Sequence, residues 1–285
     1  MIMTTYILYH DDADGYASAL SAYMVYGEKA NYICVQYGQP FPVQNLSKSD
    51  TIFILDFSYS RDILEDVHNK VNNLVIIDHH ETASQQLDGL DYAIFDMNKS
   101  GARLSWEYFN PNFPVPEIIL LVEDRDLWRF NLENTKAFDA GMRSSGKYKQ
   151  ITFWKEVLDN IDLFRQIIHD GQLLVKDLNA RVNAFVKNPS KYKLTMIDNH
   201  KVAIFNTTYD ISELGNIFNT TLDIDYSISY FFTNTGELVL SYRGRNDGVH
   251  VGELCKAMGG GGHHAAAGCK LSLSDGIDWL KKIYG

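Results

Sequence analysis

The sequence has few cysteines and no long apolar run. Its three cysteines, Cys34, Cys255 and Cys269, are odd in number and far apart, unlike the close pairs of a zinc site or the dense cysteines of a secreted scaffold. No stretch approaches the roughly 18 apolar residues of a bilayer-spanning helix, and the first residues lack the basic start and apolar run of a signal peptide. We therefore expect a soluble, cytoplasmic protein with reduced thiols and no membrane partner.

Basic residues are in the minority. The chain has 26 Lys and Arg against 36 Asp and Glu, which gives a formal net charge of −10 at pH 7. Tight binding of long duplex nucleic acid draws on a broad basic surface that releases counterions, so the charge balance argues against a long duplex as partner. A small phosphate ligand is not excluded, because divalent cations held by an acidic cluster reverse its local charge.

The first half of the chain alternates short β-rich runs with helical stretches. The whole chain has 285 residues, 45% of them apolar, which is enough for two domains of ordinary size. Strand and helix in alternation predict a parallel sheet with helices on its faces. The expected strands are Tyr6–Tyr9, Tyr32–Gln36, Thr51–Leu55 and Leu74–Ile77. We also expect a helix over 16–26 that ends at Gly27, and a helix from Arg61 that Ser60 caps.

The second half begins with a helical, charged stretch. Apolar residues at helical spacing run from Gln150 to Lys187, and Asn188-Pro189-Ser190 ends this pattern. Further strands are expected at Tyr192–Ile197, Val202–Asn206, Tyr226–Phe232 and Leu238–Tyr242, followed by helices over 249–258 and from about residue 275. The sequence thus predicts an α/β protein with a parallel-sheet domain over residues 1–148, a helical connector over 149–190 and a smaller mixed α/β domain over 191–285.

Acidic and histidine residues directly follow three of the expected strands. The hexapeptide His10-Asp11-Asp12-Ala13-Asp14-Gly15 follows the first, Asp56 follows the third, and Asp78-His79-His80 follows the fourth. Ligands of open α/β sheets bind outside the carboxyl ends of the strands, so we expect these residues to converge. A solvated acidic turn explains one such cluster, since Asp is frequent in turns, but not three clusters at one sheet edge. Crowded carboxylates repel one another unless a cation neutralises them, which predicts a metal site.

The residue types indicate the metal and the chemistry. A mixed set of carboxylates and imidazoles suits Mn²⁺ better than the all-oxygen sites usual for Ca²⁺ or Mg²⁺, although Mg²⁺ or Co²⁺ could substitute. The carboxylates are numerous enough for two ions about 3.5 to 4 Å apart that share one bridging Asp and activate a water for in-line attack on phosphorus. Phosphoester hydrolysis is the reaction that such a centre performs.

These three clusters resemble the first three signatures of the DHH phosphoesterases, the third of which names the superfamily. The resemblance implies a set of metal ligands: His10 and Asp12 for one ion, Asp14 and His79 for the other, and Asp56 as the bridge. It also implies that His80 reaches the substrate phosphate and that Asp78 supports the site, so that the catalytic residues are His80, Asp56 and Asp78.

The fourth signature of this family is an Asp at the end of a small apolar segment. Residues 120–128, Leu-Leu-Val-Glu-Asp-Arg-Asp-Leu-Trp, match it, and a charged helix end is the alternative interpretation. Two aspartates compete for the role within this segment. We take Asp124 rather than Asp126 as the metal ligand.

A glycine run near the end of the chain is the last motif. Residues 259–268, Gly-Gly-Gly-Gly-His-His-Ala-Ala-Ala-Gly, would let bare backbone N–H groups meet a phosphate at a helix start, although a flexible helix terminus is the simpler interpretation. The run resembles the Gly-Gly-Gly-His signature of the DHH-associated C-terminal domain, which in the family binds the non-scissile end of nucleotide substrates. By this resemblance the substrate-binding residues are Arg243, Arg245, Gly261, Gly262, His263 and His264, with Arg243 and His263 foremost.

The compact two-domain layout resembles the nanoRNase (oligoribonuclease) branch of the family. The favoured function is therefore a manganese-dependent exonuclease that cleaves short single-stranded oligonucleotides to mononucleotides. The same metal site would serve a cyclic or linear dinucleotide phosphodiesterase, a 3′-phosphoadenosine 5′-phosphate phosphatase or an exopolyphosphatase. A catalytically silent nucleotide-binding protein is an alternative of another class. The sequence leaves cleavage polarity, ribose preference and a homodimer open.

Overall fold

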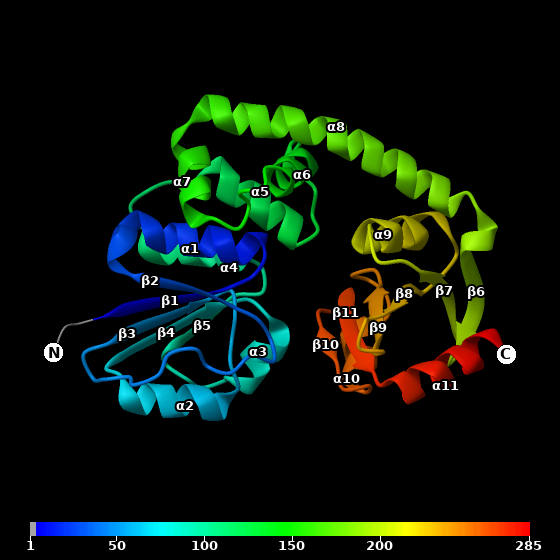
Figure 1. The fold of residues 1–285 in the computed structure, drawn as a ribbon, viewed down its shortest axis with the longest axis horizontal. Helices are drawn as coiled ribbons and strands as arrows, with labels where there is room; N and C mark the ends of the chain where they lie inside the picture. The colour runs from blue at the N-terminus through cyan, green and yellow to red at the C-terminus, as the bar shows by residue number, and fades with distance from the viewer. Residues whose placement is uncertain (1–3) are drawn as a thin grey trace. The chain divides into compact units, whose positions relative to one another are not determined.

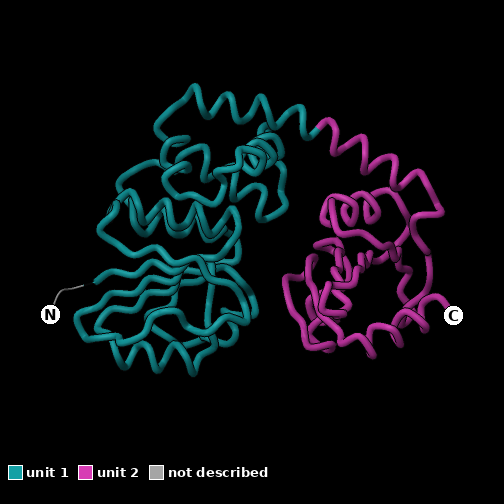
Figure 2. The backbone as a smooth tube through the Cα atoms, in the orientation of Figure 1, with its two compact units in different colours: residues 1–175 teal, residues 176–285 magenta. Residues whose placement is uncertain are grey.

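The computed structural model describes residues 4–285 and divides into two compact units. The boundary falls between Val175 and Lys176 (Figure 2). No helix among residues 4–285 combines the length and the apolar character that a bilayer crossing requires.

The first unit is built on a five-stranded sheet in the order β2-β1-β3-β4-β5, in which every pair is parallel. Its central strands are continuous apolar runs, because both faces of the sheet are covered. Ile52 and Ile54 of β3, for example, are fully buried. The strands are β1 Thr5–His10, β2 Asn31–Val35, β3 Thr51–Leu55, β4 Asn73–Asp78 and β5 Ala93–Phe95. The predicted parallel sheet is confirmed, and β5, only three residues long, is an additional edge strand.

Helices cover both faces of this sheet (Figure 1). On one face α1 and α4 pack with α5, α6, α7 and the start of α8 around a core that includes Leu20, Phe138 and Trp154. On the other face α2 and the segment 41–46 pack against the same strands around Phe57 and Leu64. The helices are α1 Ala13–Tyr26, α2 Arg61–Lys70, α3 Glu81–Gln86, α4 Gly101–Phe109, α5 Glu117–Asp126, α6 Thr135–Ser144, α7 Ile151–Asp159 and α8 Ile161–Val186.

The end of α1 and the start of α2 lie where the sequence predicts them. Gly27 follows α1 with φ 54°, and its N–H donates to the carbonyl of Tyr23, as expected of a glycine at a helix C-terminus. Ser60 precedes α2 at the N-cap position, but its side chain makes no capping hydrogen bond within the described chain. The helix begins where the sequence predicts, without the expected side-chain cap.

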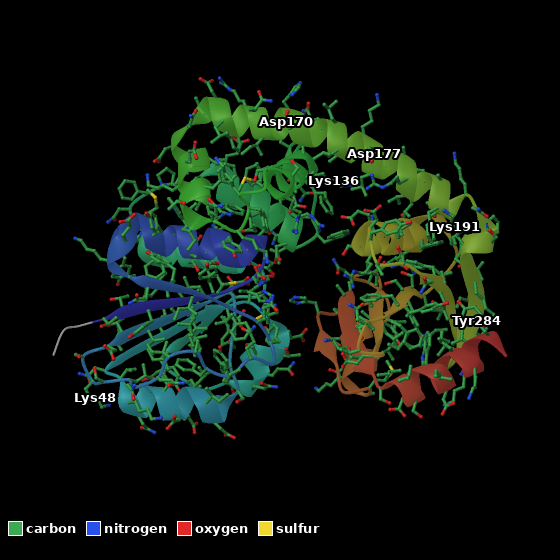
Figure 3. All side chains as sticks on the ribbon, in the orientation of Figure 1. Lys48, Lys136, Asp170, Asp177, Lys191 and Tyr284 are labelled. Atoms are coloured by element: carbon green, nitrogen blue, oxygen red, sulfur yellow. The ribbon has the colours of Figure 1, made fainter. Side chains whose placement is uncertain are left out.

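The stretch expected to be a connector is shared between the two units. Trp154 of α7 and Ile167 of α8 lie in the core of the first unit, whereas Val182 and Phe185 near the end of α8 lie in a core of the second. The labelled Asp170 and Asp177 in Figure 3 lie on α8, one on each side of the boundary. The α8 helix thus runs through the boundary, because its two ends bury apolar side chains in different cores.

The second unit contains a six-stranded mixed sheet in the order β10-β11-β9-β8-β7-β6. Only β7 and β8 pair in parallel, and α9 connects them. One face packs on α9 through Leu214 and Phe218, and the other packs on α10 and α11 through Cys255 and Trp279. The elements are β6 Tyr192–Ile197, β7 His200–Asn206, α9 Ile211–Thr221, β8 Tyr226–Phe232, β9 Leu238–Arg243, α10 Val251–Lys256, β10 Gly261–Gly262, β11 Ala266–Leu271 and α11 Leu273–Tyr284. The predicted smaller mixed α/β domain is confirmed.

Candidate metal centre

The candidate site lies at the carboxyl ends of β1, β3 and β4. The neighbours in the sheet are β1 and β3, although β2 comes between them along the chain. The strand order reverses between β1 and β3, and open α/β sheets bind ligands beyond the carboxyl ends of the strands at such a reversal. His10 ends β1, Asp56 follows β3, and Asp78 ends β4, so the sheet brings the three clusters together.

The turn after β1 presents His10 and Asp12. His10 Nδ1 lies 2.8 Å from Asp12 Oδ2, and the other oxygen of Asp12 accepts from the Gly15 N–H at the start of α1. Gly15 has to be glycine here, since a Cβ would lie 2.1 Å from the His10 carbonyl oxygen. The turn therefore returns tightly on the end of β1 and holds the imidazole beside the carboxylate.

Asp56 is the centre of the cluster. Its Oδ2 lies 3.8 Å from His10 Nδ1, and its Oδ1 lies 3.3 Å from His79 Nε2. The residue is 1% exposed, and neither carboxylate oxygen has a hydrogen-bond partner among residues 4–285. Burial, followed by the charges of Asp14 and Asp12, raises the pKa of Asp56 well above its ordinary value. An unsatisfied carboxylate buried among other carboxylates is the arrangement that a cation stabilises.

A second group of donors lies on the Oδ1 side of Asp56. His79 Nε2 is 3.6 Å from Asp14 Oδ2 and 3.4 Å from Asp126 Oδ2. Asp14 is oriented by the first turn of α4, where the N–H groups of Gly101 and Ala102 donate to its two oxygens at 2.6 and 2.9 Å. These two hydrogen bonds fix the direction of the Asp14 side chain at the N-terminus of α4.

The donor atoms of three residue sets lie within 4.8 Å of one another and could hold a metal ion. The sets are His10, Asp12 and Asp56; Asp14, His79 and Asp126; and Asp56, His79 and His80. The structure thus brings together the ligands expected in the first three motifs. For the fourth motif it places Asp126, and not Asp124, in the cluster.

Asp124 lies near the end of α5 but serves a different purpose from the one expected. Its Oδ1 accepts from the Asn131 N–H at 2.8 Å, and its Oδ2 accepts from the Leu132 N–H at 3.0 Å and from the Thr135 hydroxyl. These bonds organise the loop between α5 and α6. Asp126, two residues further along α5, has a 28% exposed side chain and contacts His79. The sequence-based choice of Asp124 therefore does not agree with the geometry.

Asp78 and His80 form a pair next to the cluster. Asp78 is fully buried; its Oδ1 lies 2.7 Å from His80 Nδ1, and its Oδ2 accepts from the Ser58 hydroxyl at 2.6 Å. Burial alone would lower the pKa of His80, but the charge and hydrogen bond of Asp78 outweigh it and raise that pKa to about 9. His80 is therefore a cation at neutral pH. Ser58 was not identified from the sequence, since a lone Ser after a strand carries no signal.

Gly101 is a further residue of the site that no sequence motif revealed. It is the first residue of α4, and a Cβ added there would lie 2.5 Å from Asp56 Cβ and 2.7 Å from Asp56 Oδ1. The glycine lets the N-terminus of α4 reach Asp14 without displacing Asp56. The separation of 87 residues between Asp14 and Gly101 explains why no local pattern shows this.

We expect Gly101→Ala to lower kcat/KM for a phosphodiester by about a hundredfold, because an ångström-scale displacement of a catalytic group costs about that much. Steady-state kinetics at saturating metal would measure it. Gly89→Ala is the control, because Gly89 has φ +81° and no atom would lie within 4 Å of an added Cβ. This substitution strains the backbone without displacing a residue of the site, so kcat/KM should not change. Normal kinetics for Gly101→Ala would show that Asp56 tolerates displacement.

The glycine run of the second unit forms a strand instead of the expected helix start. Gly261 and Gly262 form β10, which pairs antiparallel with β11 opposite Gly268 and Ala267. Gly262 has φ +144°, and a Cβ on Gly260 would lie 2.2 Å from the carbonyl oxygen of Gly268. The glycines are needed because two backbones approach closely, and the helix beside them, α10, ends at Lys256 before the run.

The other expected substrate-binding residues of the second unit have defined contacts. Arg243 donates from Nη2 to the Ser212 hydroxyl at 3.0 Å and from Nη1 to its neighbouring carbonyl. Arg245 donates to the carbonyl of Ile224 at 3.2 Å, which makes it in part a support for the loop after α9. His264 Nε2 lies 3.1 Å from the carbonyl oxygen of Gly248, while His263 is exposed.

Two parts of the chain match known protein-family domains. The N-terminal domain of the DHH family matches residues 4–122, and the DHHA1 domain matches residues 199–284. The chain contains a DHH-family N-terminal domain followed by a DHHA1 domain. The predicted family and its C-terminal domain are thereby confirmed.

Individual relatives of this DHH-family chain are distant. It is 26% identical over 305 residues to uncharacterized protein R106 of Acanthamoeba polyphaga mimivirus, an alignment that covers 97% of this chain and 70% of the relative. It is 21% identical over 299 residues to oligoribonuclease NrnB of Bacillus subtilis strain 168, with 94% and 73% covered. The solved structure of the pGpG-specific phosphodiesterase PggH from Vibrio cholerae aligns with a TM-score of 0.56 and 16% identity, over 98% of this chain and 97% of that chain. This last likeness shows a shared fold.

Family membership defines the general class of reaction. DHH proteins are metal-dependent phosphoesterases, so this chain has the fold of hydrolases that act on phosphoester bonds. The predicted hydrolase class is confirmed at this level.

Proposed function

We propose that the protein is a two-metal phosphodiesterase that hydrolyses short single-stranded oligonucleotides to mononucleotides with Mn²⁺. The position of Asp56 carries the proposal. One of its oxygens faces His10, with Asp12 beside that histidine, and the other faces His79, with Asp14 and Asp126 beside it. A carboxylate with a donor set on each oxygen is arranged to bridge two cations.

The residues present fit such ions. Both oxygens of Asp56 are buried without hydrogen bonds in the described chain, which is costly unless a cation binds them. Imidazole nitrogens together with carboxylate oxygens favour Mn²⁺, with Mg²⁺ or Co²⁺ as weaker substitutes. His10 and Asp12 would hold one ion, Asp14, His79 and Asp126 the other, and Asp56 both. Bound there, the ions would supply Lewis-acid polarisation of a phosphate and activation of a water.

The protein's own side chains contribute charge and position. The 2.7 Å contact between Asp78 Oδ1 and His80 Nδ1 holds His80 in place, and the His80 ring centroid lies 6.3 Å from that of His10. An imidazole held beside the cluster donates a hydrogen bond to the phosphate and stabilises the negative charge that develops on it in the transition state. We therefore assign phosphate binding to His80, and to Asp78 the role of orienting it.

The choice of substrate rests on the relatives and on the second unit. NrnB, to which 94% of this chain aligns, is an oligoribonuclease. In the DHHA1 domain we assign contacts with a substrate phosphate or base to Arg243 and His263, the two residues that the family signature favours for this role. Polyphosphate has no base for such residues to contact.

We expect Mn²⁺-dependent release of mononucleotides from RNA and DNA of two to about ten nucleotides, with kcat/KM highest for the shortest oligomers. A panel with cyclic dinucleotides, pGpG, 3′-phosphoadenosine 5′-phosphate and polyphosphate, run with and without chelator, measures this. Activity confined to polyphosphate or to one small nucleotide would keep the metal centre and overturn the oligonucleotide assignment. A chain that binds Mn²⁺ but hydrolyses nothing would be a silent nucleotide-binding member.

A further inference from the structure

Tyr37 is an exposed aromatic residue next to the metal centre. The residue is 57% exposed. Its ring centroid lies 5.5 Å from that of His10 and 6.1 Å from that of His80. The ring also packs on Phe57 at 4.6 Å, which gives it a firm apolar support. A large aromatic surface is thus left open to solvent beside the two histidines.

A side-chain hydrogen bond connects the turn that carries Tyr37 to the motif over residues 10–15. The backbone N–H of Gln36 donates to Gln39 Oε1, that of Gln39 donates to the Gln36 carbonyl, and Gly38 supplies φ +85°. Gln36 Nε2 then donates to Asp11 Oδ2 at 2.8 Å. Asp11 is the acidic residue of the first motif that belongs to none of the candidate metal sets, and its contacts give it a different task. It holds the turn that presents Tyr37.

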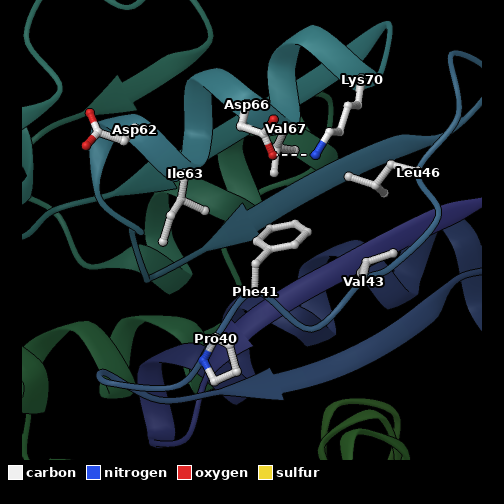
Figure 4. A pocket seen from close by; sticks show the side chains of 9 residues that line it. All are labelled: Pro40, Phe41, Val43, Leu46, Asp62, Ile63, Asp66, Val67 and Lys70. Atoms are coloured by element: carbon white, nitrogen blue, oxygen red, sulfur yellow. Dashed lines mark hydrogen bonds and ion pairs between the residues drawn. The ribbon is translucent and has the colours of Figure 1, made fainter.

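Tyr37 forms one wall of an aromatic pocket of about 410 Å³. Phe57 and Tyr59 line it as well, together with Ser58, whose hydroxyl donates to Asp78. The volume is within the range of about 300 to 1,000 Å³ typical of small-molecule sites. Tyr59 is 6% exposed, and its hydroxyl has no hydrogen-bond partner among residues 4–285. Two further lining residues, Pro40 and Ile63, also line the neighbouring groove shown in Figure 4.

We propose that this aromatic pocket binds a nucleobase of the substrate, stacked on Tyr37, in the nucleotide attached to the phosphate at the metal centre. The inference rests on the proposed phosphodiesterase function and identifies where one base lies. Both histidines contact the Tyr37 ring, and Tyr37 lines the pocket. The nucleoside attached to a phosphate beside His10 and His80 would therefore lie next to the pocket. Stacking on an aromatic ring accepts every base, because each has a π-face, which suits an enzyme that degrades oligonucleotides of any sequence.

The first test is kinetic. Tyr37→Ala and Tyr37→Leu should both raise KM for the dinucleotide pApA roughly tenfold to a hundredfold with little change in kcat, whereas Tyr37→Phe should stay close to wild type. Tyr37→Leu keeps apolar bulk against Phe57, so a loss in both variants separates stacking from collapse of the turn. Phe113→Ala, which removes an exposed ring from the same unit, is the matched control and should change nothing. An unchanged KM in Tyr37→Ala would overturn the proposal.

The second test uses binding and does not depend on turnover. With Mn²⁺ present, adenosine 5′-monophosphate should bind the wild type more tightly than ribose 5-phosphate, and Tyr37→Ala should remove that difference while leaving Mn²⁺ affinity unchanged. Isothermal titration calorimetry measures the affinities for adenosine 5′-monophosphate, ribose 5-phosphate and Mn²⁺. If ribose 5-phosphate is weakened as much as the nucleotide, the pocket does not bind the base. If wild type fails to cleave pApA yet shows this base-dependent binding, the oligonucleotide function fails and the base pocket stands.

Discussion

Asp56→Asn is expected to abolish both turnover and the binding of two divalent ions. The substitution keeps the size of the side chain but removes the charge that lies between His10 and His79. Loss of metal-assisted catalysis costs several kcal/mol, so we expect kcat/KM to fall by more than about a thousandfold. Metal content after gel filtration and the rate of pApA hydrolysis measure the two effects. Wild-type activity would show that Asp56 does not bridge the ions.

Asp56→Asn should also change the thermal stability of the metal-free protein, because it removes a buried carboxyl group that is costly to ionise. Burial and the charges of Asp14 and Asp12 raise the pKa of Asp56, so the metal-free folded state prefers its protonated form. The contribution of Asp56 to the stability of the chelated wild type is therefore fully present below the ordinary Asp pKa and is lost as the pH rises through the raised folded-state pKa. Asp56→Asn removes this loss and should melt at a higher temperature than chelated wild type at neutral pH.

Added Mn²⁺ should reverse that order. Ligand at a hundred times its Kd stabilises a protein by about 2.7 kcal/mol, a gain expected for wild type and not for Asp56→Asn. Asp88→Asn, which neutralises an exposed carboxylate of the same unit, serves as the control and should respond to Mn²⁺ as wild type does. A variant that gains as much as wild type from Mn²⁺ would contradict the assignment.

Asp126→Asn and Asp124→Asn should fail in opposite ways. Asp126 lies 3.4 Å from His79 in the cluster, so Asp126→Asn should weaken metal binding and reduce kcat/KM by about a hundredfold or more, with folding little affected. Asp124 accepts two backbone N–H bonds and the Thr135 hydroxyl, so Asp124→Asn should cost about 1 to 3 kcal/mol in the free energy of unfolding and leave Mn²⁺ affinity intact.

Chemical denaturation and metal titration of the two variants distinguish these results. The pair forms its own control, since the substitutions are identical and only two positions apart. Loss of Mn²⁺ binding in Asp124→Asn with normal binding in Asp126→Asn would restore the choice made from the sequence.

The ion pair between Asp78 and His80 shows how a motif can be predicted while its internal roles need the structure. The sequence places both residues after the expected strand Leu74–Ile77, and the family resemblance implies that His80 reaches the substrate phosphate and that Asp78 supports the site. Only the folded chain supplies Ser58, which donates to the second oxygen of Asp78 from the segment after β3. Such supports come from distant segments and leave no mark in the local sequence.

The sequence by itself determined most of the strands and the general reaction class of this protein. Apolar runs such as Thr51–Leu55 specify buried parallel strands, and carboxylates and imidazoles directly after those strands specify a metal-binding edge. These features are local, since each depends on residues adjacent along the chain. The two α/β domains and the family could therefore be predicted before any coordinates.

The tertiary structure decided what depends on direction and on distant neighbours. Residues two apart on a helix do not face the same way, so only the packing of α5 shows that Asp126 faces His79 while Asp124 binds the following loop. Gly101 matters because α4 approaches Asp56 across the fold, and the glycine run becomes β10 because β11 lies against it. Periodicity and motif spacing carry no information about such contacts. The contacts join segments that are far apart along the chain and that meet only when the chain is folded.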